Sequence, residues 1–143
     1  MLSKRRNVHV SDDESDSNSP LKDQTNRQPS LSIEEIKTGI FSTDFKEAFK
    51  ATQAARKILS RERNPPIDVL IEAGIVPKLV AFLSVTSPDP QETNQMLFEA
   101  AWALTNIASG SSAQTRVVVE AGAVPHFIRL LEYPVSIYFF FLK

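Results

Sequence analysis

The chain has 143 residues, 16 Lys and Arg against 17 Asp and Glu, and a net charge of −1. This is the length of one domain, and the balanced charge gives no overall field toward nucleic acid or an anionic membrane, so any recognition of charge must be local. The absence of cysteine excludes disulfides, thiolate zinc sites and a cysteine nucleophile.

Residues 1–30 are expected to form a disordered tail. The run Ser11–Pro20 is rich in Ser, Asp and Glu, and the tail has too few large apolar side chains to offset the entropy of ordering. A basic cluster, Lys4-Arg5-Arg6, lies within it. Such a cluster is usually solvated charge, and the alternative is a ligand for an acidic groove or a nuclear-localisation-like signal.

Two helices are predicted next. Ser32 and Glu35 have the spacing of a capping box, and we expect Gly39 to end the short helix that they begin. The second helix is predicted from Thr43 or Asp44 to Arg61, before two prolines. Its predicted buried positions are Ala48, Ala51, Ala55, Ile58 and Leu59.

An internal repeat follows. Residues 69–83 match residues 117–131 at an offset of 48. Each copy reads as a short apolar helix ended by a Gly, suited to a left-handed position, and then a Pro in the first turn of another helix. A longer helix precedes each copy, ending near Arg61 or Ser109, and residues 84–94 are predicted to form a loop. This pattern predicts an all-α, right-handed armadillo solenoid of about two full repeats and a partial third, over residues 31–132.

The long helix over residues 97–110 carries the most informative pattern. At about 100° per residue one apolar stripe is predicted to be its buried face. Trp102 and Asn106 stand one turn apart on the opposite face, on a polar strip with Gln95, Glu99 and Ser109. The predicted buried stripe consists of Leu97, Ala101, Leu104 and Ala108, flanked by Ala100 and Ile107.

Two interpretations of Trp102 compete. It could fill a gap against a neighbouring element, as most tryptophans do. Alternatively, Trp102 and Asn106 line a groove, where an indole supports the stem of a Lys or Arg and an amide bonds an extended backbone. The corresponding positions of the earlier long helix are Gln53 or Ala54 and Lys57 or Ile58, so the repeat itself requires neither residue. That difference favours the groove.

These segments resemble the importin-α (karyopherin-α) family, whose armadillo groove binds Lys/Arg-rich nuclear localisation signals through Trp-x-x-x-Asn pairs. The resemblance covers roughly residues 31–132, and residues 4–8 resemble the end of the family's importin-β-binding segment. The matching stretches are residues 98–110, 114–115 and 120–125, together with 51–62 and 65–68.

The resemblance implies the binding residues. Trp102 would support signal side chains and Asn106 would hold the signal's backbone. The pocket for an anchored lysine would be lined by Ala108, Ser109, Gly110 and Thr115, and Arg61 would touch the signal's other end. Read without the resemblance, Ser109 and Gly110 are ordinary helix-end residues, Thr115 caps a helix or faces solvent, and Arg61 is a surface charge.

The resemblance also implies partners and location. Proteins that carry Lys/Arg-rich nuclear localisation signals are the expected partners, in the cytoplasm and nucleus. Importin-β is a doubtful partner on this reading, because the family's longer basic helix is represented only by its end. The cluster Lys4, Arg5 and Arg6 could act as an autoinhibitory or importin-β-binding remnant.

The family pattern stops at about Glu132. Residues 133–143 form an apolar tail that departs from it, which indicates a truncated gene model, intron read-through or a splice variant. The corresponding alternative functions are an armadillo scaffold for a different extended peptide, and a truncated product without stable transport activity.

No enzymatic activity is predicted. His9 lies in the tail and His126 in the first turn of a helix, and neither has a recognisable catalytic partner in the sequence. No cofactor, metal ion, nucleic acid or membrane is expected as a ligand.

Overall fold

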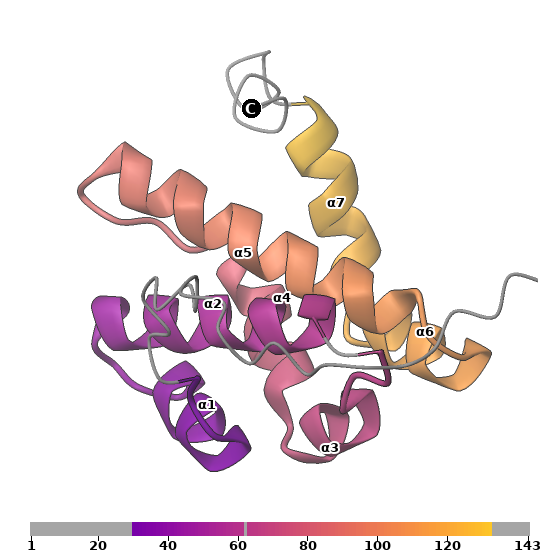
Figure 1. Ribbon diagram of the computed structural model, residues 1–143. Helices are drawn as coiled ribbons and strands as arrows, with labels where there is room; N and C mark the ends of the chain where they lie inside the picture. The colour runs from indigo at the N-terminus through magenta and orange to yellow at the C-terminus, as the bar shows by residue number, and fades with distance from the viewer. Residues whose placement is uncertain (1–29, 62, 133–143) are drawn as a thin grey trace, which may run out of the picture.

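The computed structural model describes residues 30–61 and 63–132, with the side chain of Arg61 also outside that set. Within these ranges the chain forms seven α-helices and no strand (Figure 1). In chain order they are α1 Ile33–Ile40, α2 Phe45–Arg61, α3 Ile67–Glu72, α4 Ile75–Phe82, α5 Pro90–Ala108, α6 Ser112–Glu120 and α7 Ala123–Glu132. The predicted all-α armadillo fold is confirmed for this part of the chain.

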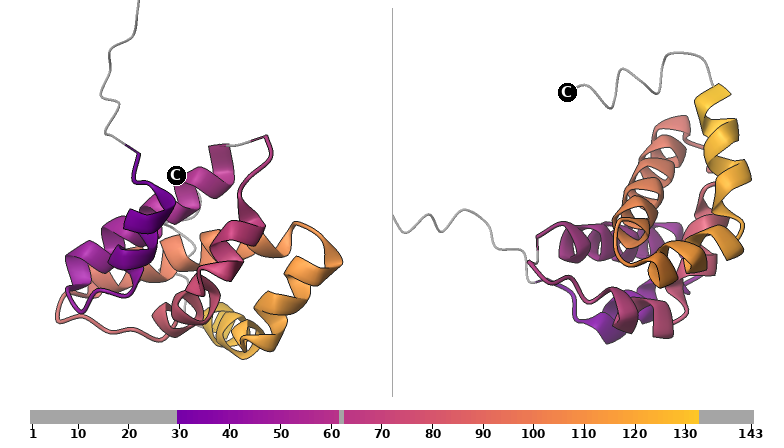
Figure 2. Two further views of the ribbon diagram at one scale, coloured as in Figure 1. Left: turned by 90° about the horizontal axis from the view of Figure 1, so that it is seen from below. Right: turned by 90° about the vertical axis from the view of Figure 1, so that its right-hand side faces the viewer.

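The repeat is arranged around one complete three-helix unit, α3–α4–α5. The pair α1–α2 precedes this unit and the pair α6–α7 follows it. The long helices α2 and α5 lie side by side, and α5 also packs against α4 and α6 (Figures 1 and 2). The two long helices therefore form a continuous surface to which both contribute side chains.

Local sequence signals set the predicted helix starts. Ser32 and Glu35 form the predicted capping box at α1. Asp44 accepts hydrogen bonds from the backbone N–H groups of Lys46 and Glu47 at the start of α2. Gly74 and Gly122 have φ angles of 74° and 84°, the left-handed conformation predicted for both copies of the repeat.

Two predicted boundaries were wrong. Gly39 lies inside α1, where a Cβ atom would come within 2.6 Å of the Ala51 Cβ, so this glycine allows α1 to approach α2 closely. The predicted loop over residues 84–94 is shorter, because α5 begins at Pro90. Asp89 caps this helix, and a proline costs nothing in a first turn, where its missing N–H would have no helical partner.

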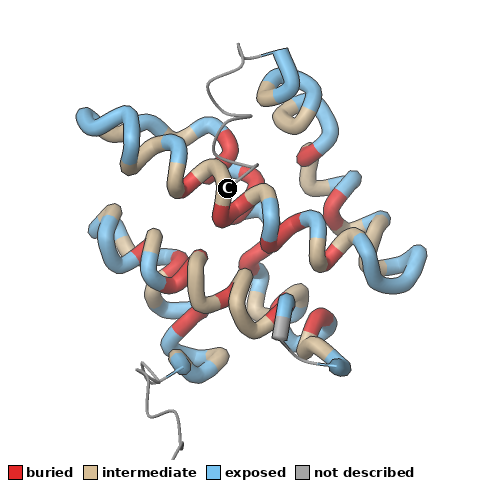
Figure 3. The backbone as a smooth tube through the Cα atoms, turned by 45° about the horizontal axis from the view of Figure 1, so that its top comes forward, coloured by how far each residue is buried: buried red, intermediate tan, exposed pale blue. Residues whose placement is uncertain are grey.

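The core runs through the middle of the described helices, whose inward sides are buried and outer turns exposed (Figure 3). In α2 the predicted burial holds except at Ile58, which is half-buried. In α5 the buried stripe is displaced by about one position, and Leu97, Ala101 and Ala108 lie at its partly buried edge. The largest fully buried side chains are Ile36, Ile40, Leu70, Ile75, Leu79, Leu83, Met96, Leu104 and Ile107.

Residues 1–29 of the tail predicted over residues 1–30, and the predicted apolar tail over residues 133–143, lie outside the described residues.

Candidate functional site

Trp102 lies on the side of α5 that faces α2, and its side chain is partly exposed. It is 39% accessible, and Phe98 meets it edge to face at 5.4 Å between ring centroids. The guanidinium carbon of Arg56, from α2, lies 4.4 Å from the centroid of the indole, which is cation–π geometry. Trp102 thus packs against α2, as the gap-filling interpretation predicts, and also keeps part of its surface accessible.

The sequence placed Glu99 on the polar strip of α5, but in the structure this residue is buried. Its carboxylate is buried and accepts two hydrogen bonds from Arg56, from Nε at 2.6 Å and from Nη2 at 3.0 Å. Gln53 Nε2 donates to the same carboxylate at 3.3 Å. A carboxylate can be buried at this position because charged and polar groups from the neighbouring helix satisfy it.

Asn106 is half-buried one turn after Trp102, and it too is linked to α2. Its Nδ2 donates to Ser60 Oγ at 2.9 Å. A side-chain amide has two N–H donors and a carbonyl acceptor. Ser60 therefore uses one donor, and the second N–H and Oδ1 make no hydrogen bond among the described residues, so they can meet an extended peptide backbone.

The four residues predicted to line a lysine pocket come together at the end of α5. Thr115 Oγ1 donates to the carbonyl oxygen of Ala108 at 2.6 Å. Ser109 Oγ donates to the backbone oxygen of Asn106 at 2.8 Å. The Thr115 bond ties the start of α6 to the end of α5, and the Ser109 bond closes the last turn of α5. Both residues therefore have a structural role whether or not a ligand binds.

Gly110 is required by packing. A Cβ atom here would lie 1.9 Å from Gln114 Oε1 and 3.1 Å from Ile67 Cδ1. Gln114 is fixed in place, since its amide completes the capping box with Ser111 and donates to Asp68 at 2.8 Å. The glycine therefore keeps the turn between α5 and α6 compact.

The remaining predicted site residues lie outside the described part of the structure. Arg61 is the last residue of α2, but its side chain is not described. Lys4, Arg5 and Arg6 fall within residues 1–29. Nothing in the structure tests their predicted roles.

Two residues at this site, Arg56 and Ser60, were missed by the reading of the sequence. Each forms a hydrogen bond with a residue of α5 that lies 43 to 46 positions later in the sequence. The repeat offset of 48 aligns equivalent positions but does not identify which side chains are neighbours on stacked helices. The sequence offered no signal for Arg56, because the burial of Glu99, which requires a cationic partner nearby, follows from the packing of α5 against α2.

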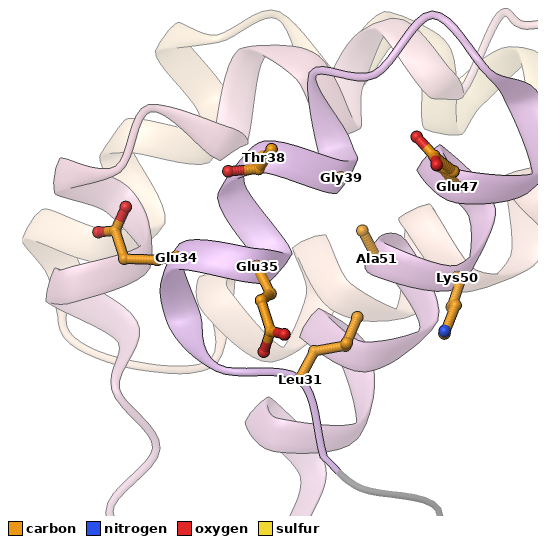
Figure 4. Close-up of a pocket in the computed structure, with 8 residues that line it drawn as sticks. All are labelled: Leu31, Glu34, Glu35, Thr38, Gly39, Glu47, Lys50 and Ala51. Carbon is orange, nitrogen blue, oxygen red and sulfur yellow. The ribbon is translucent and has the colours of Figure 1, made fainter.

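Other polar features of the described residues lie away from Trp102. An open pocket of about 360 Å³ lies between α1 and the first half of α2 (Figure 4). Its carboxylates include Glu35, which accepts hydrogen bonds from Ser32, and Glu47, which accepts one from Ser42. These hydrogen bonds already satisfy part of the acceptor capacity of the two carboxylates. The pocket contains no residue of the predicted site.

His126, on α7, contacts the turn that follows α4 in the preceding repeat. Its Nδ1 lies 2.9 Å from Ser84 Oγ and 3.2 Å from Arg129 Nη2. Arg129 also donates to the carbonyl oxygen of Leu83 at 3.1 Å. The described residues include no cluster of three or more metal-ligating side chains, and none of their helices is long and apolar enough to cross a membrane.

Two family models match parts of the chain. The one described as Armadillo/beta-catenin-like repeat matches residues 63–109, which is the unit α3–α4–α5 with its flanks. The one described as Importin beta binding domain matches residues 1–53, which include α1 and the first half of α2. The second match does not support the expectation that importin-β is a doubtful partner.

Curated relatives resemble the chain over most of its length. Importin subunit alpha of Saccharomyces cerevisiae is 46% identical over 136 residues, which is 91% of this chain and 24% of that protein. Importin subunit alpha-8 of Mus musculus is 43% identical over 128 residues, 90% of this chain and 24% of that one. The chain therefore spans about a quarter of the length of these relatives.

Solved structures give the same fold. A designed armadillo repeat protein superposes with a TM-score of 0.62 at 28% identity, over 74% of this chain and 42% of that one. A second, solved in complex with the peptide (KR)4, gives a TM-score of 0.61 at 30% identity, over 71% of this chain and 40% of that one.

Proposed function

The chain belongs to the importin-α family, and on that premise we propose that it is a nuclear import adaptor that binds basic nuclear localisation signals along the surface shared by α2 and α5. It would act between cytoplasm and nucleus, by binding rather than by catalysis.

The observation that carries this proposal is the paired geometry of Trp102 and Asn106. One turn apart on α5, they offer a partly exposed indole and the unused part of an amide. An indole attracts a cation and packs against its aliphatic stem, while the amide bonds a backbone peptide group. A Lys- or Arg-rich peptide in extended form satisfies both requirements.

The alternative is an armadillo scaffold for an extended peptide of another composition. The same Asn106 would hold any peptide backbone, so the distinction rests on Trp102. The designed armadillo repeat protein of similar fold that was solved in complex with (KR)4 supports a basic peptide as the ligand.

The test is the affinity of the full chain for a labelled (KR)4 peptide. We expect Trp102→Ala and Asn106→Ala each to weaken binding by about 1–2 kcal/mol, roughly five- to thirtyfold in Kd, since each removes one of the two contacts. Binding should also weaken with added salt.

Val69→Ala is the matched control, because Val69 is a 49% exposed apolar residue on α3. Equal binding by all four proteins would contradict the site. Peptides selected from a random library that lacked Lys and Arg would instead support the alternative scaffold.

We further propose importin-β as a second partner, through residues 1–53, which match the model described as Importin beta binding domain. The basic residues Lys4, Arg5 and Arg6 would carry this contact. Replacing all three with alanine should then weaken binding of purified importin-β to the full chain. An unchanged affinity would remove these residues from the interface.

A further inference from the structure

Arg56 covers part of the indole at the proposed peptide site. Its guanidinium carbon lies 4.4 Å from the ring centroid, and its side chain is only 16% exposed. The two hydrogen bonds that Arg56 donates to the carboxylate of Glu99 fix the plane of the guanidinium group. Trp102 therefore contacts both Arg56 on α2 and the ring of Phe98 on its own helix.

The charge of Arg56 matters for any cation that approaches the rest of the ring. A cation already stacked on an indole repels a second one and uses part of the ring's attraction. The carboxylate of Glu99, 8% exposed and in direct contact with Arg56, offsets this charge in a poorly solvated position. The pair thus presents a nearly neutral group to the ligand.

On the basis of the proposed function, we propose that Arg56 and Glu99 are a positioning pair that sets the affinity of Trp102 for cationic side chains. Arg56 holds the indole in one orientation. Glu99 prevents the held arginine from repelling the incoming Lys or Arg. Both residues act through Trp102 without touching the ligand.

Glu99→Gln isolates the charge, since glutamine keeps the shape and one acceptor for Arg56. We expect this variant of the full chain to bind (KR)4 about fivefold more weakly than the unchanged protein. The double variant Arg56→Gln/Glu99→Gln removes both charges, so we expect it to bind more tightly than Glu99→Gln. It should still bind about twofold more weakly than the unchanged protein, because Arg56 no longer orients the indole. Glu72→Gln, an exposed residue on α3, controls for the change in net charge.

A purely structural role of Arg56 and Glu99 predicts a different ranking of the variants by their affinity for (KR)4. If the pair only cross-linked α2 to α5, the double variant would bind no better than Glu99→Gln, and this result would overturn the proposal. Binding by Glu99→Gln equal to that of the Glu72→Gln control would also overturn it. Thermal melts identify any variant that does not fold, and the double variant keeps the test open if Glu99→Gln fails.

The positioning role can also be measured without peptide, because Trp102 is the only tryptophan in the chain. Replacing both Arg56 and Glu99 with alanine should increase acrylamide quenching of its fluorescence and lower its anisotropy. Unchanged quenching and anisotropy in a folded double variant would overturn the positioning role. Failure of the unchanged chain to bind (KR)4 would instead refute the proposed function and leave this fluorescence test valid.

Discussion

At the scale of single residues, charged side chains form hydrogen bonds with polar groups close to them in the sequence. Ser32 and Glu35 show this at the start of α1. The backbone N–H and the hydroxyl of Ser32 both donate to Glu35 Oε2 at 2.8 Å. These bonds lower the pKa of Glu35 below its ordinary value of 4.5.

The lowered pKa of Glu35 gives a pH prediction. Because the pKa is lower in the folded chain than in the unfolded chain, the ionised carboxylate stabilises the fold above about pH 4.5, and this stabilisation is lost as the pH falls through the lower folded value. We therefore expect Glu35→Gln to lower Tm at pH 7, and the difference from the unchanged protein to shrink as the pH falls below about 4.5.

Glu34→Gln is the control for this measurement, since Glu34 is the adjacent exposed residue and makes no hydrogen bond among the described residues. A Tm difference for Glu35→Gln that stayed constant from neutral to acid pH would show that the Ser32 contact does not depend on its charge.

At the scale of helices, local chemistry made much of the fold predictable. Capping residues are local signals, and they identified the starts of α1 and α2. The repeated Gly and Pro likewise predicted the turns before α4 and α7, where Gly74 and Gly122 have positive φ. Each of these features depends on residues within a few positions, so the sequence is sufficient to identify them.

The errors at this scale have tertiary causes or come from ambiguous signals. Gly39 resembled a helix end, yet it is needed where α1 touches Ala51 of α2. Pro90 resembled part of a loop, yet it occupies the first turn of α5 after the cap Asp89. A glycine or proline can serve either purpose, and only the packing of the helices decides between them.

The candidate site likewise has features that the sequence predicted and features that depend on tertiary packing. The spacing of Trp102 and Asn106 predicted their shared face, because residues four apart on a helix are neighbours. Their contacts with Arg56 and Ser60 were not predictable, because they depend on how α2 and α5 stack. The burial of Glu99 follows from the same stacking.

At the scale of the whole molecule, the nearly neutral net charge means that affinity for a basic peptide has to come from the candidate site. With a net charge of −1 the chain has no general attraction for basic peptides, so recognition has to come from a local arrangement. The sequence contains one tryptophan, and therefore one Trp-x-x-x-Asn pair. Affinity for a basic signal should depend on this pair, without the gain that several linked sites provide.

The most direct test of this account is an NMR titration of the full, isotope-labelled chain with (KR)4. We predict that the indole Nε1–H of Trp102 and the side-chain amide of Asn106 shift first and saturate together, along with neighbouring amides of α2 and α5. Shifts confined to the carboxylate-lined pocket between α1 and α2, with the Trp102 and Asn106 signals unmoved, would contradict the assignment of the binding site.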